Sequence, residues 1–492
     1  MQAPPTYQDL LEENRRLKAE IAGRTVAVDV AVPSLISTEE GVYGEALNIT
    51  ESFERELFEA VGGTSRASTV FNEDEIQWPS AACVRNLLVY GRTWTSWMHC
   101  ALHHPTFEAE CHQFLEESGS GNTPDPFWLA VYFSFLSAAL IFMNEDEAEA
   151  AGIHQQTGAL LLNWYDSALY FLQRADFLRR WDVRTVQATA ILGIVSINVG
   201  DSKMQSVLWA CAIRIAQFLN MGNDRAHQNE SLLLTETRRR LWWTLVICEW
   251  IPIPYHAPCI SKADFQIELP ATLDDEELLS EPRQDDLPRP IQYHIVMIQL
   301  AKIYHGFRVS LNTLSGKAPE IVTLVLQTDE ALADNIASLP PHLRFEISSS
   351  SSVTESPDID KPWIQWQRIN ISLILLYYRI AVNRVLQNQW VQDPTTFART
   401  RAICLGSARG IISLASTCTD SLARHRPWAT SLHLFSAAII LGVEARFHAD
   451  ESKQQYVQDM RFCVGFLNGV KDQSIIATHA VQILEEQFPD EQ

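Results

Sequence analysis

Histidine is the most concentrated chemistry-bearing residue type in the sequence. His99, His103, His104 and His112 lie within fourteen residues. His99 and His103 are four positions apart, a spacing that on a helix places two imidazoles on one face, where they could share a metal ion. No acidic residue completes a known ligand pattern, and Pro105 is expected to end that helix. We therefore interpret these histidines as structural and predict no metal site and no cofactor.

A carboxylate and an imidazole form the second candidate for chemistry. Glu249 and His256 follow a tryptophan pair, just before a proline-rich segment. A buried carboxylate near an imidazole can carry out acid–base chemistry, although a satisfied core pair, or no contact, is the commoner outcome. If the chain is an enzyme, Glu249, His256, His103 and His104 are its first catalytic candidates. The preferred interpretation assigns no catalytic residue.

Two charged runs invite a functional interpretation. The acidic run 274–277 could bind a magnesium ion that bridges a diphosphate, but it lies among prolines, so a solvated acidic loop is the preferred interpretation. The basic run Arg238–Arg240 is a weak nuclear-localisation or phosphate signal, and more often such runs form surface ion pairs. The sequence motifs of common hydrolases, zinc proteases and nucleotide-binding loops are absent.

Composition limits the class of protein. The 492 residues are 47% hydrophobic and 20% charged, as in ordinary globular proteins. Acidic residues outnumber basic ones by 60 to 38, giving a formal charge of −22, which argues against the chain as a whole binding nucleic acid. The nine cysteines are widely spaced and no secretory signal is evident. We expect reduced thiols in a cytosolic or nuclear protein.

Long apolar-periodic segments with polar breaks dominate the sequence after residue 80. They cover roughly 81–99, 106–117, 126–143, 155–180, 183–199, 203–219, 232–252, 290–312, 320–338, 363–390, 395–422, 427–447 and 453–486. Most exceed the usual length of strands, so the predicted fold class is all-α. The most apolar run, Phe127–Met143, is shorter than the roughly 20 residues of a membrane span. It predicts a buried central helix, and no membrane partner is expected.

The N-terminal residues have a short heptad pattern. Tyr7, Asn14 and Ile21 fall at position a, and Leu10 and Leu17 fall at position d. This pattern predicts either a short dimerisation helix or a lone amphipathic helix. Three parts are therefore predicted: a coiled-coil-like helix at 1–24, an acidic linker at 25–80 and a large helical body at 81–490.

Four segments, in this order, resemble parts of a known family. They are Trp97–Phe107, Tyr165–Ala188, Ala212–Asp224 and Glu236–Trp243. The family is the fungal-specific transcription factor domain, the large helical regulatory region that follows a binuclear zinc cluster in many fungal regulators. The last segment is similar to the family's Glu-x-x-Arg-Arg-Arg-x-Trp/Phe-Trp. His104 stands where the family usually has arginine, residues 248–258 also depart from its pattern, and the six-cysteine zinc cluster does not occur in this sequence.

The resemblance implies a nuclear transcriptional regulator of a metabolic or secondary-metabolite pathway. Such a protein would form homo- or heterodimers and contact other transcription factors or coactivators. DNA contact would come from an upstream zinc cluster or from a partner, and the helical interior could hold a small-molecule effector. One alternative is a regulator-like scaffold repurposed as a natural-product biosynthetic enzyme or small-molecule binder. Another is a partner without DNA binding that forms heterodimers through Tyr7–Ile21.

Overall fold

The described part of the protein is helical. The computed structural model describes residues 48–489 except 64–65, 71, 118–123, 155, 254–255, 281–282, 284–286, 315–317, 346–360, 418–427 and 448–452. These residues form no strand, and their one isolated β-bridge joins Asn223 to Gln266. The predicted all-α class is confirmed. The helix expected at 1–24, with its heptad residues Tyr7 to Ile21, lies outside the described residues.

The first half of the fold surrounds one apolar helix. Its helices are α3 (Ala81–Trp94), α4 (Ser96–His99), α5 (His104–Glu117), α6 (Pro126–Leu140), α7 (Glu145–Ala150), α8 (Thr157–Arg174), α9 (Val183–Leu192), α10 (Ser202–Phe218) and α11 (Leu232–Trp250). α6 packs against α3, α8 and α9, while α10 packs against α9. Every residue of α6 after Pro126 is buried, as predicted for the central helix. Ser134 and Ser137 donate to carbonyl oxygens one turn back, at 2.7 and 2.8 Å, so their hydroxyls are satisfied within the helix.

Several helices begin where the sequence predicted because a polar residue caps each first turn. The side chains of Ser80, Asp125, Asp182 and Ser231 accept backbone N–H groups from the first turns of α3, α6, α9 and α11. These are the residue types preferred at this position, where the first N–H groups have no partner within the helix. Pro126 at the first position of α6 fits the same pattern.

The second half consists of longer helices packed in sequence. They are α12 (Ile291–Thr313), α13 (Ala318–Ala337), α14 (Trp363–Asn383), α15 (Gln387–Gln392), α16 (Ala398–Thr417), α17 (Trp428–Phe447), α18 (Lys453–Val470) and α19 (Ile475–Gln487). α14 packs against α12, α13 and α16, and α17 packs against α16, α18 and α19. The stretches Trp363–Gln392 and Trp428–Phe447 are long and apolar enough to cross a membrane, but each is mostly buried, as in the core of a globular protein.

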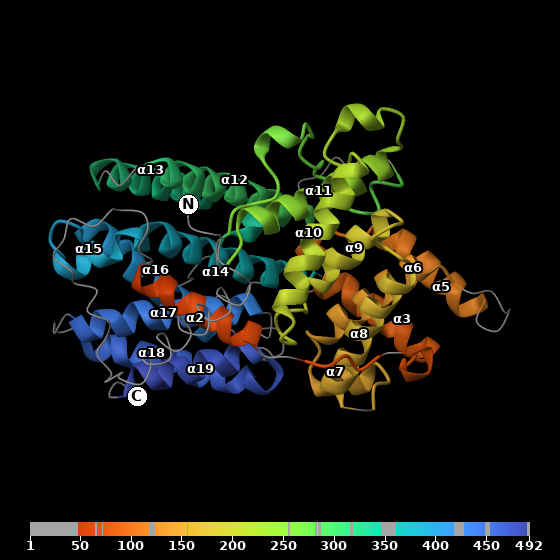
Figure 1. The fold of residues 1–492 in the computed structure, drawn as a ribbon, viewed down its shortest axis with the longest axis horizontal. Coiled ribbons are helices and arrows are strands. Elements are labelled where there is room, and N and C mark those ends of the chain that lie inside the picture. Colours follow the sequence, from red (N-terminus) through yellow and green to blue (C-terminus); the bar gives the residue numbers. More distant parts are fainter. Residues whose placement is uncertain are drawn as a thin grey trace, which may run out of the picture. The chain divides into compact units, whose positions relative to one another are not determined.

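The structure differs from the expected linker at one important place. Residues Ile49–Gly63 form helix α2, which contacts α17 and α19 from the opposite end of the chain (Figure 1). Leu57, Phe58 and Val61 bury its apolar face. Buried Glu54 interrupts the apolar pattern of this face, which explains why the sequence did not indicate a core helix.

Glu54 is the acceptor of a buried polar cluster. Arg384 donates to it at 2.7 Å, and the hydroxyls of Tyr377 and Ser436 also donate to its carboxylate. All four residues are buried. This cluster fixes α2 against α14 and α17.

We predict that Glu54→Ala lowers the free energy of unfolding by about 3–5 kcal/mol, because it leaves the Arg384 guanidinium buried without its counter-charge. Urea unfolding of the full chain at neutral pH measures this change. Glu59→Ala is the matched control, because Glu59 lies on the exposed side of the same helix. Equal stability of the two variants would contradict the assigned role of Glu54.

Candidate functional site

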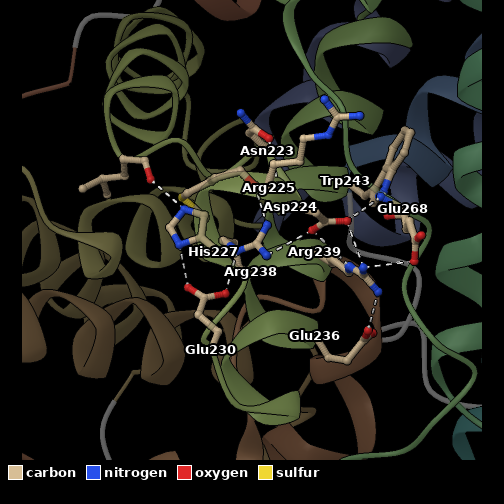
Figure 2. A network of polar contacts seen from close by, with 12 residues as sticks. Asn223, Asp224, Arg225, His227, Glu230, Glu236, Arg238, Arg239, Trp243 and Glu268 are labelled. Atoms are coloured by element: carbon tan, nitrogen blue, oxygen red, sulfur yellow. Dashed lines mark hydrogen bonds and ion pairs between the residues drawn. The ribbon is translucent and has the colours of Figure 1, made fainter.

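The arginine run Arg238–Arg240, in the first half of α11, organises a network of ion pairs (Figure 2). Arg238 donates to Glu230 at 2.9 Å and to Asp224 at 3.0 Å. Arg239 donates to Asp224 at 2.9 Å and to Glu268 at 3.1 Å. The run is therefore engaged in ion pairs, as the sequence favoured. The pairs with Asp224 are largely enclosed, whereas the side chain of Glu268 is exposed.

This network joins two irregular segments to α11. Asp224 accepts the backbone N–H of Glu268 at 2.9 Å, and the Trp243 indole donates to the Glu268 carbonyl at 2.8 Å. Burial alone would raise the pKa of Asp224, but hydrogen bonds from Arg239, the Glu268 backbone and Arg238 together hold that pKa below its usual value. The carboxylate therefore stays ionised and holds both segments.

Gly222 allows the backbone before Asp224 to pack closely against the indole ring of Trp242. A Cβ atom at Gly222 would lie 2.6 Å from the indole ring of Trp242. Only glycine leaves room for this contact. The contact explains why the segments Ala212–Asp224 and Glu236–Trp243, which carried part of the resemblance, belong to one unit.

The third arginine connects the histidine region with the acidic run. Arg240 donates to the Asp275 carboxylate at 2.6 Å and to the Leu273 carbonyl at 2.6 Å. The His104 backbone N–H donates to the same carboxylate at 2.9 Å, and His103 Nε2 lies 2.9 Å from the Asp275 carbonyl oxygen. The histidine region, the arginine run and the acidic run, which are separate in the sequence, therefore meet at one place in the fold.

The solvated loop expected for the acidic run is wrong for two of its residues. Asp275 and Glu277 are largely enclosed, and Glu277 accepts two hydrogen bonds from Arg289 at 2.7 and 2.8 Å. Hydrogen bonds from Arg289 hold the pKa of Glu277 far below its usual range. The sequence could not reveal this because the pairing arginine on α11 lies 35 positions away from Asp275.

His104 has a neutral side chain in this setting. Burial lowers the pKa of His104 to about 4, although Asp275 opposes the shift. The imidazole therefore adds no positive charge to the region around Asp275.

A cavity of about 410 Å³ opens beside this cluster. Its wall contains Trp97 from α4, His104 from α5, Arg240 from α11, the segment around Asp275, and Lys361 and Trp363 at the start of α14. Several separate parts of the chain thus meet around one space of the size that small organic ligands occupy.

The structure brings Glu249 and His256 together only loosely. Glu249 Oε2 lies 4.0 Å from His256 Nε2, and the Glu249 carboxylate accepts the backbone N–H of Cys259. Glu249 is buried, whereas His256 is more than half exposed. His103 and His104 have different partners, at Asp275, so the four catalytic candidates form two separate groups.

His99 and His103 do not share a helix. α4 ends at His99 because Cys100 adopts a left-handed backbone conformation with φ 46°, and α5 begins at His104. His99 Nδ1 lies 2.5 Å from the Ala190 carbonyl oxygen. Within the described ranges, no group of three or more His, Cys, Asp or Glu residues is arranged to hold a metal ion.

The family model of the fungal specific transcription factor domain matches residues 92–378, which contain α4 to α13, most of α14 and the whole site described above. This match covers more than half of the chain. The chain belongs to this family.

Curated relatives from fungi share this similarity. The agnestins biosynthesis cluster transcription factor AgnL11 of Paecilomyces divaricatus is 23% identical over 72% of this chain and 52% of its own length. The probable transcription factor lepB of Aspergillus flavus is 24% identical over 74% of this chain and 70% of its own. The aurofusarin cluster transcription factor aurR2 of Gibberella zeae is 26% identical over 30% of this chain and 22% of its own. The chain thus spans about half the length of AgnL11. Nothing in these matches supports the alternative of an enzyme.

A solved structure shares the fold. The chain titled "Structure of the K. lactis CBF3 core" superposes with a TM-score of 0.59 over 90% of both chains, at 10% identity. Identity at this level indicates a common helical architecture and no more.

We predict that Arg240→Met lowers the free energy of unfolding by about 3–5 kcal/mol at pH 7, because Asp275 is then a buried carboxylate without its cation. Burial would raise the pKa of Asp275, but Arg240 and the His104 N–H hold it below the ordinary 3.8. The stabilisation of the folded state by the ionised Asp275 carboxylate is therefore complete above pH 3.8, its ordinary pKa. It is lost as the pH falls through the lower pKa that Asp275 has in the folded protein.

Urea unfolding of wild type and variant between pH 7 and pH 3 measures both effects. Exposed Arg225, which lies in the segment that Asp224 anchors, provides the control Arg225→Met. If the difference in free energy of unfolding between wild type and Arg240→Met stayed constant down to pH 3, the stabilisation by Arg240 would not depend on the ionised Asp275 carboxylate.

Proposed function

We propose that this chain is the regulatory part of a nuclear transcription factor that controls a secondary-metabolite gene cluster. The observation that carries the proposal is the family match over residues 92–378, together with relatives that are named as cluster transcription factors. The proposal extends from the domain to the whole protein, including its location in the nucleus.

The charge distribution supports contacts with protein rather than with DNA phosphates. The formal charge of the chain is −22. Its densest basic run, Arg238–Arg240, is occupied by ion pairs to Asp224, Glu230, Glu236, Glu268 and Asp275. Phosphate binding requires free basic groups. DNA contact is accordingly assigned to an upstream zinc cluster or to a partner, and this body to coactivators or other transcription factors.

Dimerisation is assigned to the heptad at the N-terminus. Tyr7, Leu10, Asn14, Leu17 and Ile21 supply its a and d positions. A buried asparagine at position a favours a two-stranded arrangement in register. This support comes from the sequence pattern, which fits either a homodimer or a heterodimer with a relative.

We predict that deletion of the gene lowers the transcripts of one contiguous group of biosynthetic genes, and that the wild-type gene restores them. RNA sequencing of the deletion and complemented strains measures this effect. Complementation with His256→Ala should restore the transcripts fully, because the exposed imidazole has no catalytic duty in a regulator. Loss of the pathway's product with unchanged transcripts would contradict the proposal and favour an enzyme.

A second expected outcome concerns assembly. Asn14→Leu should convert a dimer of the full chain into larger oligomers, because an apolar residue at position a no longer restricts strand number and register. Size-exclusion chromatography with light scattering measures the mass. Arg15→Ala, at an outward-facing heptad position, is the control and should leave the mass unchanged. An identical mass for both variants and wild type would count against the assigned helix.

A further inference from the structure

We infer that the cavity between α4, α5, α11 and the start of α14 binds a small aromatic carboxylate, the ligand class that would act on the proposed regulator. This inference deepens the proposed function and rests on it only for the biological meaning of the ligand. Charge, unpartnered polar atoms and apolar surface define the binding site itself.

The cavity is positively charged within a strongly acidic protein. Four basic side chains line it, Arg92, Arg240, Arg283 and Lys361, against three acidic ones, Asp274, Asp275 and Glu276. Each of the three carboxylates already pairs with one of the arginines. Within the described ranges no carboxylate pairs with Lys361. Among the described residues, one positive charge therefore remains for a ligand, which favours a monoanion.

The wall also contains buried polar atoms without partners. Trp97 Nε1, Arg240 Nε and His104 Nδ1 are buried and have no hydrogen-bond partner among the described residues. All three residues line the cavity. Buried donors left unpaired cost free energy, so such a group of them calls for an explanation. The Trp97 and Arg240 nitrogens can only donate, and the natural complement is a ligand rich in oxygen acceptors.

Much of the remaining wall is apolar. Trp363, two residues after Lys361, lines the cavity, and Pro288, Pro290 and Ile291 contribute further apolar surface. A volume of about 410 Å³ accommodates a bicyclic aromatic ring with one charged group. A carboxylate would pair with Lys361 and accept hydrogen bonds from the unpaired donors, and an aromatic ring would pack against the indole of Trp363. The cavity is therefore suited to an aromatic carboxylate.

The test uses 2-naphthoate as the probe and 2-naphthamide as its neutral counterpart, with binding to the full chain measured by calorimetry. We expect 2-naphthoate to bind one-to-one and 2-naphthamide to bind at least about tenfold more weakly, a difference of about 1.4 kcal/mol. Lys361→Gln should reduce the affinity for 2-naphthoate to that for the amide, whereas Lys361→Arg should retain it.

Lys453→Gln is the matched control, because Lys453 is exposed on α18 and does not line the cavity. Circular dichroism establishes that each variant is folded. Absence of one-to-one binding, equal affinity for acid and amide, or an unchanged affinity in Lys361→Gln would each overturn the inference.

These outcomes are independent of transcription. Binding that depends on Lys361 in a protein whose deletion leaves transcripts unchanged would support the site and refute the regulator. Transcript control without such binding would support the regulator and refute the site.

Discussion

The ion pairing of three consecutive arginines in the first half of α11 determines how the central part of the structure fits together. Neighbouring residues of a helix point about 100° apart, so Arg238, Arg239 and Arg240 reach three different directions. Arg238 holds the segment around Asp224 and Glu230, Arg239 joins Asp224 to Glu268, and Arg240 holds Asp275 against the start of α5. These ion pairs hold the irregular segments in place, although the described residues form no strand. Each guanidinium pairs with a carboxylate, which offsets the free-energy cost of burying its charge.

Much of the fold follows from local sequence signals, but the polar contacts within it do not. Caps such as Asp125 and Ser231 mark helix starts because their side chains act on N–H groups two or three residues away. The burial of α6 follows from its uniform apolarity. In contrast, Glu54 and Asp275 look like solvent-exposed acids in the sequence, because their partners Arg384 and Arg240 lie far away in the chain. The cluster of His104, Asp275 and Arg240 could be found only once the fold had brought its parts together.

Arginine–carboxylate pairing also explains how an acidic protein of this family contains a positively charged cavity. Arg240 pairs with Asp275, and other arginines pair with the remaining carboxylates of the run 274–277, namely Arg92, Arg283 and Arg289. Among the described residues that line the cavity, Lys361 then leaves one positive charge. His104 contributes no charge, because burial lowers its pKa to about 4.

The central claim is that the protein controls transcription from a biosynthetic gene cluster. Chromatin immunoprecipitation of the natural, untruncated protein, tagged in its own host, tests it most directly. The account predicts enrichment in the nucleus and occupancy of the promoters of a contiguous group of biosynthetic genes. A cytosolic protein without specific promoter occupancy would contradict the account.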